Sequence, residues 1–341
     1  MSFLKLTVFP ENLKHNFLLM QRTYPNVEIA AVVKANGYGL GIENIVPPLA
    51  EAGCKIFFVN RLTEGEKVRH LAPQAAVFVL DAFIGSDTPR QYKTLNLTPV
   101  FSTLEALSRY PQEQNIAVRL DTGFNLAGIA ASDEAAVLRA LKGRSVALLM
   151  SHLACAERPD NPKNKEQLDL FLKYAALFPE AKKSLSASFG AALGKEYHFD
   201  MIRAGAALYG SSSLPGSLPV ASLTAKIGWL KWFNAGNSLG YNDACLLKKD
   251  TLIASVPVGA GDGIVHKAGC FVRFKDVLLP VLSAPTTNYL PIDATAVSDC
   301  ICTGDEVALF DTVYSPDRLA LDAGMEVGAD VLIRLNGASF S

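Results

Sequence analysis

The stretch Ala31-Val-Val-Lys-Ala-Asn-Gly-Tyr-Gly-Leu-Gly41 joins an apolar strand pattern to a glycine-rich loop through a single lysine, Lys34. In (β/α)8 barrels, catalytic side chains lie at the carboxyl ends of the strands. A lysine stem among buried apolar side chains is desolvated, which lowers the pKa of the amine and favours its neutral form. A neutral amine can attack an aldehyde to form a Schiff base. These residues leave one alternative open, in which Lys34 only extends from the strand end into solvent.

The chain around Lys34 alternates short apolar runs with helical patterns. The first helix is predicted to begin at Pro10, because Leu13, Phe17 and Met20 recur at helical spacing. Apolar strands separated by amphipathic helices indicate a parallel sheet covered on both faces. Eight strands fit a (β/α)8 barrel, although a doubly wound open sheet gives a similar alternation. The predicted strands are 27–34, 55–60, 76–80, 97–101, 116–121, 146–151, 184–188 and 199–203.

The pattern changes after about residue 215, where helical periodicity gives way to short apolar runs between Gly, Pro, Asn and Asp. This pattern is typical of an all-β domain. We therefore expect an α/β chain with a barrel domain at residues 1–220 and a C-terminal all-β domain at residues 221–341. The predicted strands of the second domain include 223–233, 251–258, 277–282 and 306–310.

Composition narrows the function classes. The 341 residues are 50% hydrophobic, and 32 Lys and Arg balance 33 Asp and Glu. The resulting net charge of −1 predicts neither a nucleic-acid partner nor binding to an anionic membrane surface. The uncharged stretch 204–225 contains two prolines and several glycines, so we expect loops rather than a membrane helix. The six cysteines lack metal-ligand spacing and no secretion signal is evident, which predicts a cytoplasmic protein with free thiols and no metal site.

Several motifs, in one order, resemble those of the alanine racemases, which bind pyridoxal 5′-phosphate (PLP) on a barrel followed by a β domain. The resemblance covers nearly the whole chain. It implies a PLP-dependent isomerase, active as a homodimer on a small amino acid, that makes D-alanine as a cell-wall precursor. Besides the stretch around Lys34, the motifs are Arg119-Leu-Asp-Thr-Gly123, Ser151-His-Leu-Ala-Cys-Ala156, residues 199–210, Ser238-Leu-Gly-Tyr241 and Pro257-Val-Gly-Ala-Gly-Asp-Gly263.

The resemblance implies a role for each matching residue. Lys34 would carry PLP and act as one catalytic base, and Tyr241, delivered by the partner subunit, would be the other. The implied PLP-binding residues are Lys34, Tyr38, His152, Gly190, Arg203, Gly205 and Ala206. Tyr38 and the backbone of Gly190, Gly205 and Ala206 would hold the phosphate, Gly190 standing where the family usually has a serine.

Arg203 would face the pyridine nitrogen of PLP, with His152 supporting it. An arginine cannot release its proton, so it donates a hydrogen bond and leaves that nitrogen unprotonated. The ring is then a weaker electron sink, which suits racemisation better than transamination. This arginine also disfavours a PLP decarboxylase, a class that usually places an acidic residue at this nitrogen. The structural alternative for Arg203 is an ion pair with Asp200.

Some positions depart from the family pattern. Leu126 replaces an arginine that holds the substrate carboxylate, and Arg119 replaces the lysine that orients that arginine. We expect Arg119 to supply the lost charge, with pairing to Asp121 as the alternative. The predicted substrate-binding residues are Arg119, Thr287 and Asn288, the last two in place of a Met-Asp pair. Ala260 and Ala329 replace tyrosines of the entrance and the phosphate site. These changes keep two alternatives open: a racemase for a different or larger amino acid, and a degenerate PLP-binding homologue or carrier without racemase activity.

Overall fold

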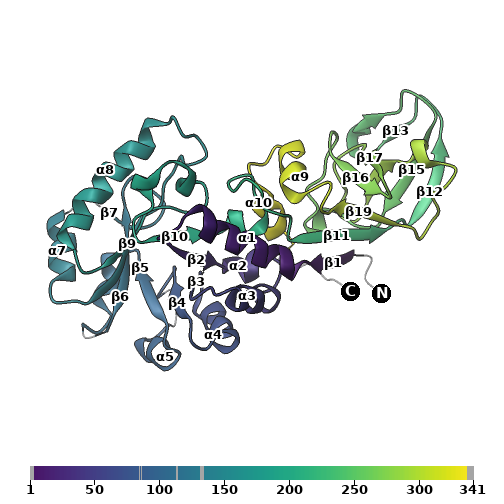
Figure 1. Ribbon diagram of the computed structural model, residues 1–341. Coiled ribbons are helices and arrows are strands. Elements are labelled where there is room, and N and C mark those ends of the chain that lie inside the picture. The colour runs from purple at the N-terminus through teal and green to yellow at the C-terminus, as the bar shows by residue number, and fades with distance from the viewer. Residues whose placement is uncertain (1–3, 84, 86, 113, 131–133, 336–341) are drawn as a thin grey trace.

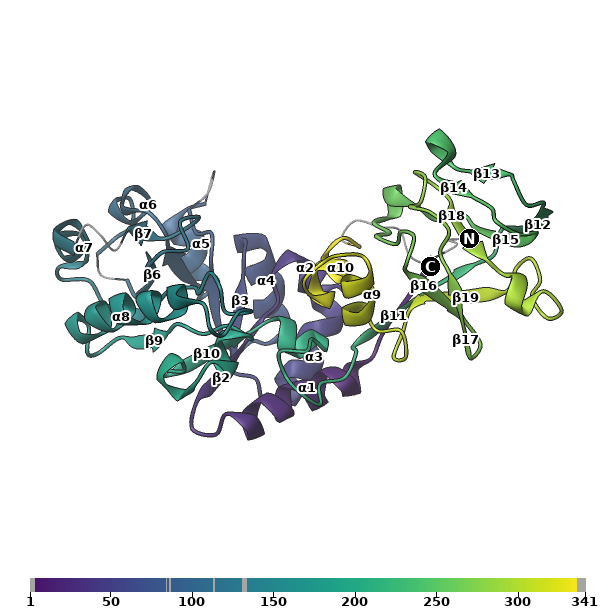
Figure 2. The same cartoon turned by 90° about the horizontal axis from the view of Figure 1, so that it is seen from above.

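The computed structural model describes residues 4–83, 85, 87–112, 114–130 and 134–335. A barrel of strands and helices and a β domain lie side by side, and two short C-terminal helices lie between them (Figure 1). The view from above shows the same elongated arrangement (Figure 2). None of the helices within these ranges combines the length and the apolar character that a bilayer crossing requires.

The barrel consists of parallel strands that pair in the order β10-β2-β3-β4-β5-β6-β8-β9. Its ends meet where Ala187 bridges to Arg203 and Arg203 N donates to Ser186 O at 3.1 Å. The prediction of a (β/α)8 barrel is thereby confirmed. The strands are β2 (Glu28–Val32), β3 (Ile56–Val59), β4 (Ala76–Val79), β5 (Thr98–Phe101), β6 (Ile116–Asp121), β8 (Val146–Met150), β9 (Lys182–Ser184) and β10 (Met201–Ala204), and the two-residue β7 (Ile129–Ala130) pairs with β6.

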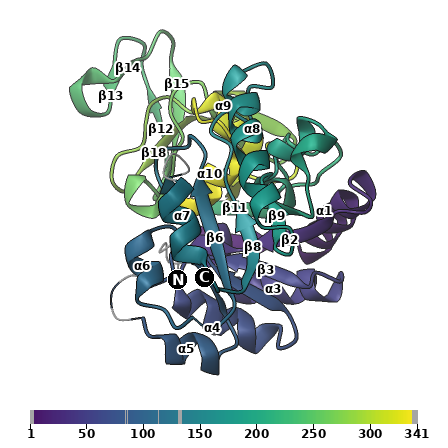
Figure 3. The same ribbon diagram turned by 90° about the vertical axis from the view of Figure 1, so that its left-hand side faces the viewer.

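Helices cover the outside of the strands, as the end view shows around β6 and β8 (Figure 3). Helix α1 (Pro10–Thr23) begins with its proline in the first turn and buries Leu13, Phe17 and Met20, as predicted. The other helices of the barrel half are α3 (Ile42–Glu51), α4 (Leu62–Leu71), α5 (Pro89–Thr94), α6 (Leu104–Ser108), α7 (Glu134–Leu141) and α8 (Pro162–Leu177).

Two predicted strands were wrong in their bounds. The strand predicted at 184–188 is β9 (Lys182–Ser184), because its pairing with β8 ends at Ser184; the next residues join β10 through the Ala187 bridge and the hydrogen bond at Ser186 O. The run 223–233 is two strands, β11 (Ala221–Lys226) and β12 (Trp229–Phe233). They belong to different sheets, because the chain turns at Gly228, whose N–H donates to Ser255 O.

The second domain is built from antiparallel strands, which confirms the predicted β domain. One sheet has the order β1-β11-β19-β16-β17, and its first strand comes from the N-terminus of the chain. A second sheet has the order β12-β15-β18, and β13 and β14 form a hairpin. The bounds are β1 (Leu4–Val8), β13 (Ser238–Leu239), β14 (Cys245–Leu246), β15 (Thr251–Val256), β16 (Phe271–Phe274), β17 (Val277–Pro280), β18 (Leu290–Asp293) and β19 (Glu306–Phe310).

Two helices that the sequence patterns did not predict, α9 (Pro316–Asp322) and α10 (Gly328–Ile333), follow β19. Helix α10 contacts the barrel at α2 (Lys34–Tyr38) and at η3 (Ala206–Tyr209). Asp317 ties the helices to the barrel, because its carboxylate accepts from Gly328 N at 2.6 Å and from Ser212 N at 2.7 Å. Helix α10 therefore lies over the carboxyl ends of the barrel strands, where Lys34 is located.

Candidate active site

A cavity of about 600 Å³ opens at the carboxyl ends of the barrel strands. A volume of this size suits a cofactor together with a small substrate. Helix α10 contributes Ala329, Asp330 and Ile333 to its wall. The cavity brings together every predicted site residue of the barrel half: Lys34, Tyr38, Arg119, His152, Gly190, Arg203, Gly205 and Ala206.

A left-handed turn places Lys34 and Tyr38 in the same cavity. Residues 35–38 all have positive φ angles, from 53° to 65°. This conformation costs each non-glycine residue roughly 1–2 kcal/mol, so other contacts must hold it. Asn36 N donates to Glu64 Oε1 at 2.9 Å, and Asn36 Oδ1 accepts from Ile42 N at 3.2 Å. These contacts fix the loop that follows the lysine.

The Lys34 amine has the properties that a Schiff-base lysine needs. Burial, and then the positive charge of Arg119, lower its pKa from the ordinary value of 10.5. The carboxylates of Asp81 and Glu64 act in the opposite direction but do not reverse the shift. A larger fraction of the amine is therefore neutral and nucleophilic at neutral pH than in a solvent-exposed lysine.

Hydroxyl groups gather at one end of the cavity. A side chain at Gly205 would bring its Cβ within 2.6 Å of Tyr38 Oη, so only glycine lets the backbone approach this hydroxyl. Ser188 Oγ accepts from Gly205 N and Ala207 N, each at 3.0 Å. The Gly205 N–H, which the resemblance assigns to a phosphate, donates to Ser188 in this structure. Ala206 N–H has no acceptor among the described residues.

Ser188 is a site residue that the sequence analysis missed. Its two accepted hydrogen bonds leave its proton free to donate, and Ser188 lines the cavity. A serine at Gly190, where the resemblance placed the family hydroxyl, would bring its Cβ within 3.0 Å of Leu153 Cδ1. The hydroxyl lies instead two residues earlier in the chain. The serine-rich run 184–188 was the available signal.

Arg203 is buried in the cavity wall with most of its guanidinium already bound. Nη1 donates to Ser184 O at 2.8 Å and Nη2 to Ser151 O at 2.6 Å, whereas Nε has no acceptor within the described ranges. The alternative ion pair with Asp200 is wrong, because Asp200 Oδ2 accepts from Lys183 N. Burial and the charge of Arg119 lower the pKa of Arg203 to about 9, so it stays charged at neutral pH.

His152 lies beside Arg203, with Nδ1 at 3.4 Å from Nη2. Burial, then the charges of Arg203, Arg119 and Lys34, lower the pKa of His152 to about 3. The imidazole is therefore neutral at physiological pH and can accept from the arginine. This is the supporting place that the resemblance implied.

Arg119 faces the cavity and has no ion-pair partner among the described residues. Its guanidinium carbon lies 5.6 Å from the centre of the Phe124 ring, and its Nε is buried without a hydrogen-bond acceptor. The alternative pairing with Asp121 is wrong, because Asp121 Oδ1 accepts from the backbone N–H groups of Gly123 and Asn125. Burial lowers the pKa of Arg119, and the carboxylates of Asp81 and Asp121 oppose that shift. Leu126 is 82% exposed at the cavity rim.

Three predicted residues lie outside this cavity. Tyr241, in the turn between β13 and β14, is 77% exposed. Thr287 and Asn288 are exposed in the loop before β18. Within one chain, the second domain therefore adds only its C-terminal helices to the cavity.

Comparison with known proteins places the chain in a family. The family model for the alanine racemase N-terminal domain matches residues 8–213, and that for the C-terminal domain matches residues 220–336. The chain belongs to the alanine racemase family. An alanine racemase of Rickettsia peacockii is 33% identical over 98% of this chain and 97% of its own length. The resemblance drawn from the motifs is thus confirmed.

Solved alanine racemases share the fold over the full chain. The biosynthetic alanine racemase of Pseudomonas aeruginosa superposes with a TM-score of 0.88 at 26% identity and covers 100% of both chains. The alanine racemase of Bartonella henselae, solved with covalently bound pyridoxal phosphate, gives a TM-score of 0.88 at 22% identity over 98% of both chains. Both halves of the fold, the barrel and the β domain, are therefore those of alanine racemases.

Proposed function

We propose that this protein interconverts L- and D-alanine as a PLP-dependent alanine racemase. The observation that carries the proposal is the convergence of Lys34 and Arg203 on one cavity in a chain of this family. PLP, when bound, supplies an electron sink that acidifies the Cα–H bond of an attached amino acid. An arginine at the far end of the cavity, rather than a carboxylate, suits racemisation.

The donors that the cavity leaves open fit this cofactor. Lys34 would hold its aldehyde carbon through a neutral amine. The hydroxyls of Tyr38 and Ser188, with the free N–H of Ala206, would hold the phosphate. Burial raises the pKa of Tyr38, so its hydroxyl keeps the proton that it would donate. Arg203 Nε would donate to the pyridine nitrogen.

The two proton-transfer groups would come from two subunits. Lys34 Nζ would take or return the Cα proton on one face, and Tyr241 of the partner subunit on the other. Because Tyr241 is 77% exposed and outside its own cavity, we assign it to the cavity of a second copy. Thr287 and Asn288 are exposed on the same domain and would reach the partner's substrate in the same way.

A protein with such shared sites would be a homodimer, and we place it in the cytoplasm. The barrel unit, residues 1–220, would face the partner's β unit, residues 221–341. Strand β1 is the exception to this division, because it pairs with β11 in the sheet of the second unit.

Arg119 would bind the substrate carboxylate. Its Nε is buried without a partner, and an unpaired buried charge is costly. A carboxylate would satisfy it, and Leu126 offers no charge for that purpose. Alanine is the substrate named for the family relatives above, and none of them is named for a larger amino acid.

Two measurements test the proposal. The purified protein should show the visible absorption of bound PLP and racemise L-alanine, followed by circular dichroism. A panel of larger L-amino acids tests the alternative substrates. A protein that binds PLP but racemises no member of the panel would contradict the proposed function.

Complementation tests the shared site. Homodimers of Lys34→Ala or of Tyr241→Phe should each be severely impaired. Coexpression of the two variants yields mixed dimers in which one site has both groups intact. With random pairing, activity should recover to about a quarter of the wild-type value. No recovery would indicate that Tyr241 serves its own chain or has no role.

A further inference from the structure

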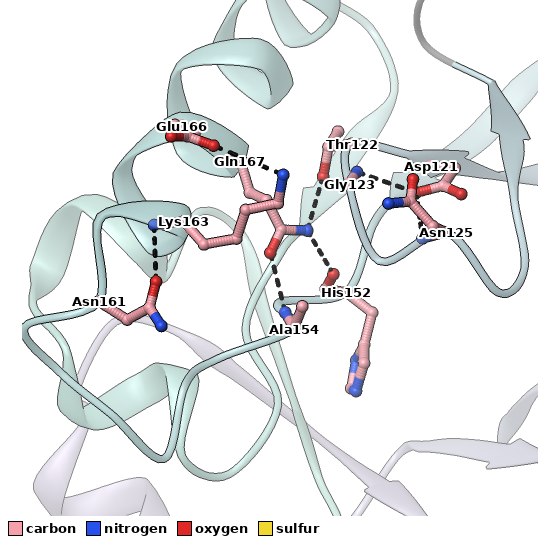
Figure 4. Close-up of polar contacts among 10 residues, drawn as sticks. All are labelled: Asp121, Thr122, Gly123, Asn125, His152, Ala154, Asn161, Lys163, Glu166 and Gln167. Atoms are coloured by element: carbon pink, nitrogen blue, oxygen red, sulfur yellow. Dashed lines mark hydrogen bonds and ion pairs between the residues drawn. The ribbon is translucent and has the colours of Figure 1, made fainter.

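Gln167 is a fully buried side chain of α8 that bridges the loops after β6 and β8 (Figure 4). Its Nε2 donates to His152 O at 2.9 Å and to Thr122 Oγ1 at 3.2 Å. Its Oε1 accepts from Ala154 N at 2.8 Å. Burying an amide is costly unless its hydrogen bonds are made, and here both N–H groups and the oxygen are used.

The hydrogen bonds beyond Thr122 run in one direction. Ser151 Oγ donates its only proton to Leu120 O at 2.8 Å. Its 2.8 Å contact with Thr122 Oγ1 is then one in which Thr122 donates. Thr122 in turn accepts from Gln167. The chain of donors therefore begins at the amide N–H of Gln167, and an acceptor-only side chain at this position would reverse it.

The hydrogen bonds of Gln167 form two branches, one through His152 and one through Thr122 to Ser151, and both lead to Arg203. Arg203 Nη2 donates to Ser151 O at 2.6 Å and lies 3.4 Å from His152 Nδ1. Gln167 anchors His152 through its carbonyl and Ser151 through Thr122. Gln167 thus fixes from behind the residues that hold Nη2 of the guanidinium, whereas Ser184 holds Nη1.

We propose that Gln167 is a positioning residue for Arg203: it holds residues 151–154 so that Nη2 of the guanidinium stays bound and Nε stays open to the cavity. This inference rests on the proposed function, because it gives Arg203 its place at the pyridine nitrogen. Gln167 touches neither the cavity nor the cofactor position, so it acts only through Ser151 and His152.

The test uses the holoenzyme and the fate of each turnover. If Arg203 shifts, a larger fraction of the pyridine nitrogen would be protonated. The proton taken from Cα would then more often be delivered to a carbon of the cofactor than back to Cα. Hydrolysis by one water molecule would then release pyruvate, whose keto oxygen comes from the water, and would leave the amino group of alanine on the cofactor. In Gln167→Met, which keeps the length but no polar atom, pyruvate release relative to racemisation should rise roughly 10-fold. The visible spectrum of bound PLP should change as well.

Two further variants sharpen the result. Gln167→Glu keeps the shape of the side chain but places an acceptor oxygen against the acceptor His152 O. Like Gln167→Met, it should raise the ratio of pyruvate release to racemisation. Glu166→Gln, on the exposed side of the same helix, is the matched control and should leave both readouts unchanged. If Gln167→Met does not fold, Thr122→Val removes the Ser151 branch alone and should raise the pyruvate ratio to a smaller extent.

The outcomes separate the two proposals. Folded variants at Gln167 or Thr122 with the wild-type ratio and spectrum would overturn the positioning role while wild-type racemisation stands. A loss of thermal stability alone, without a change in the ratio, would do the same. A wild-type protein without PLP absorption or racemisation would overturn the proposed function and this inference with it.

Discussion

Replacing Arg119 by leucine removes the cation that we assign to the substrate carboxylate. Its Nε is buried without an acceptor among the described residues, and its guanidinium carbon lies 5.6 Å from the centre of the Phe124 ring. A hydrogen bond to a charged group contributes about 1.5–3 kcal/mol. Its loss should lower kcat/KM for alanine about 10- to 150-fold, mostly through KM. Arg119→Lys should recover part of this, because the charge returns without the planar fork.

Stability separates this role from a structural one. Since Arg119 has no ion-pair partner among the described residues, Arg119→Leu removes a desolvation cost, and the apoprotein should melt no lower than wild type. Arg144→Leu is the matched control: Arg144 donates to the carbonyls of Tyr110 at 3.0 Å and Leu107 at 3.1 Å. It should lower the melting temperature and leave KM unchanged. Steady-state kinetics and thermal unfolding of both variants decide the matter. An Arg119→Leu enzyme with wild-type kcat/KM, or one destabilised like the control, would refute the reasoning.

Four further results are expected. The rate at which the apoprotein binds PLP should rise with pH already below the pH range in which an ordinary lysine loses its proton, because the pKa of Lys34 is lowered. Arg119→Leu should move this rise to higher pH, because the charge of Arg119 helps to lower that pKa. An unchanged pH profile in Arg119→Leu would contradict the effect of Arg119 on Lys34. Ser188→Ala should weaken PLP binding roughly 10-fold but not pyridoxal binding, because pyridoxal lacks the phosphate; equal losses would exclude the assigned contact. Tyr241→Phe should slow deuterium exchange into one enantiomer of alanine more than the other, and equal slowing would argue against a one-face base. Burial lowers the pKa of His266 to about 4, so between about pH 4 and 6.5 the unfolded chain binds one more proton here than the folded chain, and the free energy of unfolding falls as the pH falls. In urea unfolding, His266→Gln should make the free energy of unfolding depend less on pH in this range. An unchanged pH dependence would assign the proton to another group.

Much of the barrel could be predicted from the sequence because its strands are buried on both faces. Runs such as 76–80 and 146–151 are therefore almost entirely apolar and lie close to the observed bounds of β4 and β8. The cavity residues Lys34 and His152 follow strand ends, so the topology alone brings them to one rim. Arg203 could be found in the same way, near the end of the last strand.

The remainder depends on contacts that sequence spacing does not contain. The sequence assigned Gly190 only a backbone donor, and the hydroxyl of Ser188, two residues earlier, reaches the cavity because the loop after β9 places it beside Gly205 and Ala207. The left-handed turn at residues 35–38 includes alanine, asparagine and tyrosine, which rarely adopt it, and it depends on Glu64 from another helix. The place of helix α10 at the cavity depends on the tie at Asp317 and on its contacts with α2 and η3. Each of these features is set by a distant partner.

The pairing of β1 with β11 also bears on how the chain is made. Leu4 pairs with Ala225, so β1 leaves the ribosome roughly 200 residues before its partner strand. At usual synthesis rates that interval is on the order of 10 to 40 s. During it, the barrel can assemble while the Leu4–Val8 segment presents an open strand edge, with Leu4 destined for the core. Open edges of this kind are templates for aggregation. A circular permutation that moves β1 to the other end of the chain, so that β11 is synthesised before it, would remove this exposure without changing the finished fold, and should raise the soluble yield of nascent chains.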